Sequence, residues 1–189
     1  MGVLGMLAGA LFIAGFVPYI RAVLLGRTRP AKASWIVWAV VDTITFAGML
    51  AEGTVNGQIV GTVLGLWVVL ILALRYGIPG WTRTDKWCLG GAALGLALWA
   101  TFSDPILAIL MSQIVTVIGS VPTFVSAWSH PEREDKLAWT LFWVSCVITM
   151  AIVPEWTMAH AAQPIAFFAI ESTMMAILFL HPSPPLRES

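Results

Sequence analysis

Two carboxylates stand near the middle of long apolar stretches, where ionisable side chains are rare. Asp42 lies inside the segment 34–52, and Glu171 lies inside the segment 161–181. At a rise of about 1.5 Å per residue, a helix would place each of them about 12–15 Å from its nearer end. No Lys or Arg stands at that depth, and an unpaired buried carboxylate either takes a proton or holds a cation. We therefore predict that both residues bind a proton or the cationic group of a substrate. The alternative is a protonated acid that only bonds a neighbouring helix.

Helical spacing indicates which side chains accompany the two carboxylates. Residues three, four or seven positions apart share a helix face, so each carboxylate has polar and aromatic neighbours on its own face. A third polar face of this kind lies in the segment 105–128. We expect these three faces to line one cavity. The candidate substrate-binding residues on them are Glu171, Asp42, Trp38, Gln163, Gln113 and Thr45.

Trp143 joins this set as a second aromatic side chain, beside Trp38, that could stack on a substrate ring or cation. Aromatic residues at helical spacing more often pack against other helices, and that alternative stays open for both tryptophans.

The other reactive side chains form no recognisable catalytic or metal site. Cys88 and Cys146 fit no metal or redox spacing, and the three histidines all stand near the ends of apolar segments. The sequence has no HExxH, P-loop or serine-elbow motif. A retinal protein would need a lysine in the middle of a helix, and none stands there. We therefore expect no enzyme, no cofactor and no metal.

The composition indicates a membrane protein. Of the 189 residues, 59% are hydrophobic and 11% are charged, whereas a soluble domain carries about 25% charged residues. This balance excludes a soluble globular protein, a disordered chain and a nucleic-acid binder with a basic face. A spanning helix needs about 20 mainly apolar residues. Seven segments qualify and predict an all-α integral membrane protein with seven transmembrane helices: 3–25, 34–52, 57–78, 87–103, 105–128, 137–154 and 161–181.

The basic residues predict the orientation of these helices. Every Lys and Arg falls at or in the first, third and fifth connections or in the C-terminal tail. The other connections carry only Glu52, Asp104 and Glu155 as charged residues. Because basic residues favour the cytoplasmic side, we expect a multi-pass protein of the cell membrane with its N-terminus outside and its C-terminus in the cytoplasm.

An internal repeat relates the two ends of the chain. A shift of 104 positions aligns Gly15, Val17 and Pro18 with identical residues, and further identities follow through Ala47. An odd number of spans separates the copies, so they cross the membrane in the same direction and are parallel. Transporters of this design bind substrate near the midplane, between the repeats; a duplicated sensor or scaffold is the alternative. The predicted parts are a three-helix repeat at 1–80, a linker helix at 81–104, a second repeat at 105–182 and a cytoplasmic tail at 183–189.

Pro18 and Pro122 occupy matching positions in the two repeats. A proline inside a helix removes a backbone donor and loosens the preceding turn. We predict that these two prolines are hinges; a static kink is the alternative.

The 3+1+3 arrangement, the two prolines, the outside N-terminus and the basic connection GRTRPAKASW resemble the SWEET and PQ-loop superfamily of small-solute carriers. The resemblance covers nearly the whole chain in architecture, but in motif only the segments around the prolines. The family's Pro-Gln pair reads Pro18-Tyr19 and Pro122-Thr123 here, and the sugar-binding Asn is absent from both third helices.

The resemblance implies a transporter that moves a small polar or cationic solute by alternating access, and proton linkage is one form this could take. A receptor or sensor of the same fold, which binds a ligand without transport, is the alternative. The expected partners are the solute and the lipid bilayer, with no nucleic acid. Gly57, Gly61 and Gly65 have the spacing for close helix packing, and the small-residue faces also permit a homo-oligomer.

Overall fold

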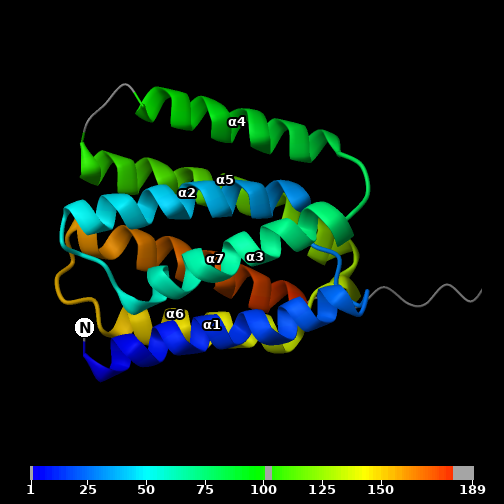
Figure 1. Ribbon diagram of the computed structural model, residues 1–189, viewed down its shortest axis with the longest axis horizontal. Coiled ribbons are helices and arrows are strands. Elements are labelled where there is room, and N and C mark those ends of the chain that lie inside the picture. Colours follow the sequence, from blue (N-terminus) through cyan, green and yellow to red (C-terminus); the bar gives the residue numbers. More distant parts are fainter. Residues whose placement is uncertain (1, 101–103, 181–189) are drawn as a thin grey trace, which may run out of the picture.

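The computed structural model describes residues 2–100 and 104–180, and every regular element in that part of the chain is helical. The expected all-helical chain is therefore confirmed for these residues, while the predicted tail 183–189 lies outside them. The helices are α1 (Val3–Leu24), α2 (Lys32–Ala51), α3 (Gly57–Tyr76), α4 (Arg83–Trp99), α5 (Pro105–Ser129), the 3₁₀ turn η1 (Pro131–Arg133), α6 (Lys136–Ala151) and α7 (Met158–Leu180) (Figure 1).

Five of these helices, α1, α2, α3, α5 and α7, are long and apolar enough to cross a membrane. Helix α4 has 17 residues and α6 has 16, so they rise only about 24–26 Å against a hydrocarbon core of about 30 Å. Helix α6 ends at Ala151, short of the predicted 154, because the residue before Pro154 is pushed out of helical conformation. Helix α4 begins at Arg83, before the predicted 87, and its first turn includes Asp85.

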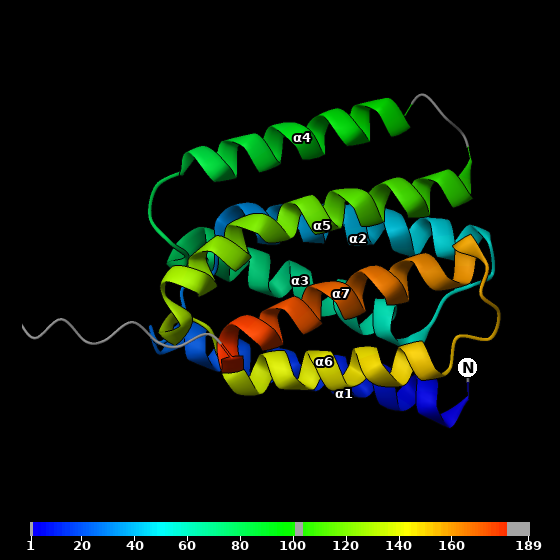
Figure 2. The same cartoon turned by 180° about the vertical axis from the view of Figure 1, so that it is seen from behind.

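Successive helices run in opposite directions along one bundle, so their connections gather at its two ends (Figures 1 and 2). One end holds the α1–α2, α3–α4 and α5–α6 connections, and we call it the basic end. The opposite end holds the N-terminus and the acidic residues Glu52, Asp104 and Glu155, and we call it the acidic end. The described basic residues at the basic end are Arg21, Arg27, Arg29, Lys32, Arg75, Arg83, Lys86, Arg133 and Lys136.

The helices α1–α3 and α5–α7 make the same set of contacts, and we call these groups the first half and the second half. Helix α1 packs on α3 as α5 packs on α7, and α2 packs on α3 as α6 packs on α7. Between the halves, α1 packs on α6 and α2 packs on α5. Helix α4 lies outside, against α5 and α2 (Figure 1). The central interface is therefore built by six helices without α4.

Glycines bring α1 and α3 together until their backbones nearly touch. A Cβ added to Gly9 would lie 2.5 Å from the carbonyl oxygen of Gly57, and one on Gly61 would lie 2.8 Å from that of Gly9. A Cβ on Gly65 would enter the ring of Phe16. The predicted close packing by Gly57, Gly61 and Gly65 is confirmed.

The two halves also cross at equivalent glycines. A Cβ on Gly15 of α1 would lie 2.5 Å from the ring of Phe142 in α6. A Cβ on Gly119 of α5 would lie 2.5 Å from Val37 in α2. Since Gly15 and Gly119 are 104 positions apart, the same small residue permits the α1–α6 and the α5–α2 crossings.

Candidate functional site

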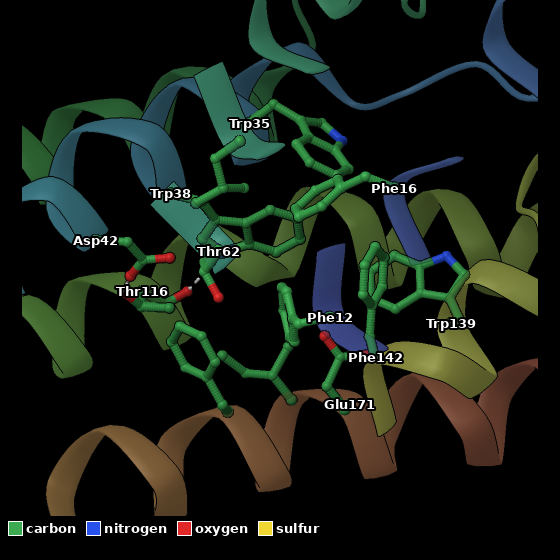
Figure 3. A pocket seen from close by; sticks show the side chains of 13 residues that line it. Phe12, Phe16, Trp35, Trp38, Asp42, Thr62, Thr116, Trp139, Phe142 and Glu171 are labelled. Atoms are coloured by element: carbon green, nitrogen blue, oxygen red, sulfur yellow. Dashed lines mark hydrogen bonds between the residues drawn. The ribbon is translucent and has the colours of Figure 1, made fainter. Parts of the chain in front are cut away.

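A cavity of about 40 Å³, counted as the space open to the centres of water-sized molecules, lies between the two halves, and side chains of α1, α2, α3, α5, α6 and α7 line it (Figure 3). Its polar lining consists of Asp42, Thr62, Thr116 and Glu171. The rest of the lining is apolar and mostly aromatic, and none of the described lining residues is basic. The cavity therefore combines two carboxylates with a wall of rings.

Asp42 is fixed to the second half through a single threonine. The residue is 2% exposed, and the hydroxyl of Thr116 donates to its Oδ1 at 3.3 Å. The indole Nε1 of Trp38, one turn away on α2, donates to the carbonyl oxygen of Thr116 at 3.2 Å. Thr116 of α5 therefore makes two hydrogen bonds to this face of α2, one as donor and one as acceptor.

Glu171 lacks such a partner. It is 6% exposed, and its Oε2 has no hydrogen-bond partner among the described residues. Figure 3 shows its carboxyl directed into the cavity beside Phe12 and Phe142. In the described part of the chain no Lys or Arg forms an ion pair with it. Buried carboxylate oxygens almost always have a partner, so this atom points to a proton, a water or a ligand in the cavity.

An aromatic cluster from both halves fills the side of the cavity toward the basic end. The ring of Phe142 lies with its centroid 4.7 Å from Phe12 and 4.9 Å from Phe16. Trp35 and Trp38 form an edge-to-face pair at 5.3 Å. Such pairs add about 0.5–1.5 kcal/mol each beyond the area they bury. The rings therefore form one wall of the cavity.

Toward the acidic end, the halves are joined by amide and hydroxyl groups instead. Gln163 accepts a hydrogen bond from Nδ2 of Asn56 at 2.7 Å and donates to Oε1 of Gln58 at 3.0 Å. Gln58 in turn donates to Oγ of Ser145 at 3.2 Å and to Sγ of Cys146 at 3.0 Å. Gln163 thus lies in a network that connects α3, α6 and α7, outside the lining of the cavity.

Gln113 and Thr45 also meet outside the cavity lining. The Nε2 of Gln113 donates to Oγ1 of Thr45 at 2.9 Å, which joins α5 to α2. The Oε1 of Gln113 is buried and has no partner within the described residues. The pair lies about one turn from Asp42 toward the acidic end.

Trp143 lies on a different face of α6 from the cavity. Its Nε1 donates to Oγ of Ser172 on α7 at 3.0 Å, and the adjacent Phe142 lines the cavity instead. The structure therefore brings together Asp42, Trp38 and Glu171 of the predicted set. The 104-residue shift contains the signal that was missed, since it aligns Trp38 with Phe142.

Pro18 and Pro122 lie inside helices that continue past them. Helix α1 extends to Leu24 and α5 to Ser129. Pro122 is buried and borders a second cavity at the basic end, together with Lys32 and Arg133. Whether these prolines act as hinges stays a prediction.

Glu134 is a buried carboxyl that the sequence reasoning missed. It lies between η1 and α6 and is 6% exposed. Its Oε2 accepts hydrogen bonds from Nε1 of Trp139 at 2.9 Å and from the Tyr19 hydroxyl at 3.4 Å. Burial raises the pKa of the Glu134 carboxyl to about 7, although these two hydrogen bonds act in the opposite direction. Close by, the backbone N–H of Arg29 donates to the carbonyl of Arg133 at 3.2 Å.

The arrangement is suited to binding a small ligand. The carboxylates can accept hydrogen bonds from a ligand or form an ion pair with a cation. The rings can pack against the apolar part of a ligand or against a cation. Comparison with models of protein families, with curated proteins and with solved structures finds no match for this chain. The function of the cavity must therefore be inferred from the residues that line it.

Proposed function

We propose that this protein is a membrane carrier that moves a small polar or cationic solute by alternating access and binds it in the central cavity. The observation that carries the proposal is Glu171, a buried carboxylate without a described partner, in a cavity between two equivalent halves. Glu171 and Asp42 hold the charged group of the solute or exchange a proton with it. Ionisable groups inside membrane helices generally face such a functional cavity.

We propose that all seven helices span the membrane. The short helix α6 is followed by Ile152 and Val153, which lengthen its apolar stretch, and a bilayer can thin locally around a short span. The gathering of basic residues at one end of the bundle supports a cytoplasmic basic end and an outside N-terminus. We place the protein in the cell membrane on the same grounds.

Membership in the SWEET and PQ-loop superfamily is part of this proposal. The equivalent contacts of the two halves support it, as do Pro18 and Pro122 at matching positions. The absence of the Pro-Gln pair and of the sugar-binding Asn argues for a solute other than a sugar.

Separate contacts at the two ends of the interface support alternating access. At the acidic end Gln58 bonds to Gln163 across the halves. At the basic end Tyr19 of the first half bonds to Glu134 of the second. Breaking one set while the other persists would open the cavity toward one side of the membrane at a time.

The test begins with a thermal-stability screen of the purified protein against sugars, amino acids, vitamins and polyamines, at about pH 5.5 and pH 8. A ligand that binds only the folded protein raises its apparent melting temperature. The hit is then labelled and followed in proteoliposomes that contain trapped unlabelled solute. We expect accelerated counterflow, whereas binding without flux would reject the carrier and favour a receptor.

A further inference from the structure

The cavity is poor in hydrogen-bond donors. The hydroxyl of Thr116 donates to Asp42, and that of Thr62 donates to the carbonyl of Gln58 at 2.9 Å. The indoles of Trp38 and Trp139 are engaged as well. Trp35 lies beside Tyr19, and Figure 3 draws its Nε1 at the far side of the rings from Glu171.

The acceptor side is different, because Oε2 of Glu171 is buried and has no described partner. A ligand that complements this cavity must therefore donate hydrogen bonds and accept few. A negatively charged ligand would face two carboxylates with no basic side chain in the described lining, so it is disfavoured by both charge and hydrogen bonding.

The aromatic rings beside Glu171 indicate the chemistry of the part of the ligand that does not bind the carboxyl. Phe12 and Phe142 flank the carboxyl in Figure 3, and Phe167 lies with its centroid 6.1 Å from that of Phe12. Ring faces attract cations and cover apolar groups. A sugar would leave several hydroxyls without partners against these rings.

A bare divalent metal ion is also a poor match for the donor set. Within the described residues, no three His, Cys, Asp or Glu side chains stand close enough to hold a metal. Metal ions that bind oxygen take six or more ligands, and the lining supplies few of them.

We infer that the ligand of the central cavity is a small organic amine: a protonated amino group on an apolar or aromatic body without a carboxylate. The ammonium binds Glu171, whose Oε2 is unpartnered, while the body packs against Phe12 and Phe142. Asp42, already bonded to Thr116, has the lesser share in binding. The inference rests on the proposed function in one respect only, that the central cavity is the substrate site.

The test compares three probes with the same aromatic body: phenethylamine, the neutral 2-phenylethanol and the zwitterionic phenylalanine. Their affinities for purified protein are measured by titration calorimetry at neutral pH. We expect the amine to bind about tenfold or more tightly than either of the others, because only it adds a charge-assisted bond without an unpaired carboxylate. Ethylamine and butylamine, each with its alcohol, extend the series to smaller bodies.

Glu171→Gln keeps the size of the side chain and removes its charge. We expect this variant to lose the amine's advantage and to bind 2-phenylethanol as the wild type does. Glu155→Gln, the same change at an exposed position of the acidic end, is the matched control and keeps the advantage. If Glu171→Gln does not fold, the ratio of amine to alcohol in the wild type still decides.

Three results would overturn the inference: equal binding of amine and alcohol, tighter binding of phenylalanine, or no binding of any amine in the series. A sugar or vitamin that binds and shows counterflow would then leave the carrier standing with a different substrate. Amine binding without flux would reject the carrier and keep the amine site.

Discussion

The interface between the two halves is held by different chemistry at its two ends. At the acidic end, Gln58 and Gln163 join α3, α6 and α7 through amide and hydroxyl hydrogen bonds. At the basic end, aromatic rings pack around Trp139, and a single buried carboxyl, Glu134, accepts bonds from both halves. Hydrogen bonds between polar side chains break and re-form in small steps, whereas a packed ring cluster must separate as a unit.

The contacts at the two ends of the interface therefore respond to different conditions. The amide network contains no titratable group apart from the Cys146 thiol, so its strength changes little around neutral pH. The basic end contains Glu134, whose charge changes near neutrality.

Trp139→Ala removes the central ring of the aromatic cluster at the basic end. Truncation of a buried Trp costs about 3–5 kcal/mol of unfolding free energy, and Trp139 also loses its bond to Glu134. Chemical denaturation in detergent measures the loss. Trp156→Ala, at an exposed tryptophan, should change the stability by less than about 0.5 kcal/mol. Equal losses in the two variants would contradict the account.

Glu134→Gln tests the pH response of the basic end. Burial raises the pKa of this carboxyl from 4.5 to about 7, so the folded protein keeps the proton longer than the unfolded chain does. The contribution of Glu134 to stability is therefore complete below about pH 4.5, declines as the pH rises and is lost above about pH 7. Relative to Glu134→Gln, the wild type should lose up to about 3 kcal/mol across this range.

Melting curves of both proteins from pH 4 to pH 8 provide this comparison, and groups common to the two proteins cancel in the difference. A difference that stays constant with pH would show that Glu134 titrates as an ordinary exposed glutamate.

Gln58→Met removes the centre of the acidic-end network and keeps the side-chain volume. It removes one hydrogen bond each from Gln163, Ser145 and Cys146, while Gln163 keeps its bond to Asn56, and we expect a loss of about 1–2 kcal/mol. Gln113→Met is the matched control, because that side chain makes one hydrogen bond within the described chain, to Thr45, and its Oε1 is already unpartnered there. A larger loss in Gln113→Met would reverse the proposed ranking of the two amides.

Trp38→Phe and Trp143→Phe separate the cavity from the outer helix faces. Trp38 lines the cavity and bonds to Thr116. Loss of this hydrogen bond should cost about 1 kcal/mol of binding free energy, which weakens ligand binding several-fold. Trp143 bonds to Ser172 away from the cavity, and its loss should leave binding unchanged. Calorimetric titration of both variants measures the difference.

The sequence predicted three residues that line the central cavity, but it did not predict most of the residues around them. Depth inside an apolar segment identified Asp42 and Glu171, and helical spacing added Trp38. The same spacing could not separate Gln163 and Gln113 from the cavity lining, because periodicity defines a face of a helix and not the neighbour that covers it. Both amides instead form hydrogen bonds with side chains on adjacent helices.

Glu134 and Gln58 are two residues whose burial could not be predicted from the sequence. Glu134 stands in a charge-rich connection, which normally lies in water, and only the packing of Trp139 and Tyr19 over it reveals its burial. Gln58 stands at the start of α3, where a polar residue usually reaches solvent. Helix order was predictable, whereas the ends of α4 and α6 depended on local capping and on Pro154.

The most direct test of the central claim is counterflow of a labelled amine into proteoliposomes loaded with the unlabelled compound, for the wild type and for Glu171→Gln. We expect rapid uptake by the wild type and uptake at the level of empty liposomes by the variant. Uptake by the wild type at the level of empty liposomes, with an amine that binds the purified protein, would contradict it.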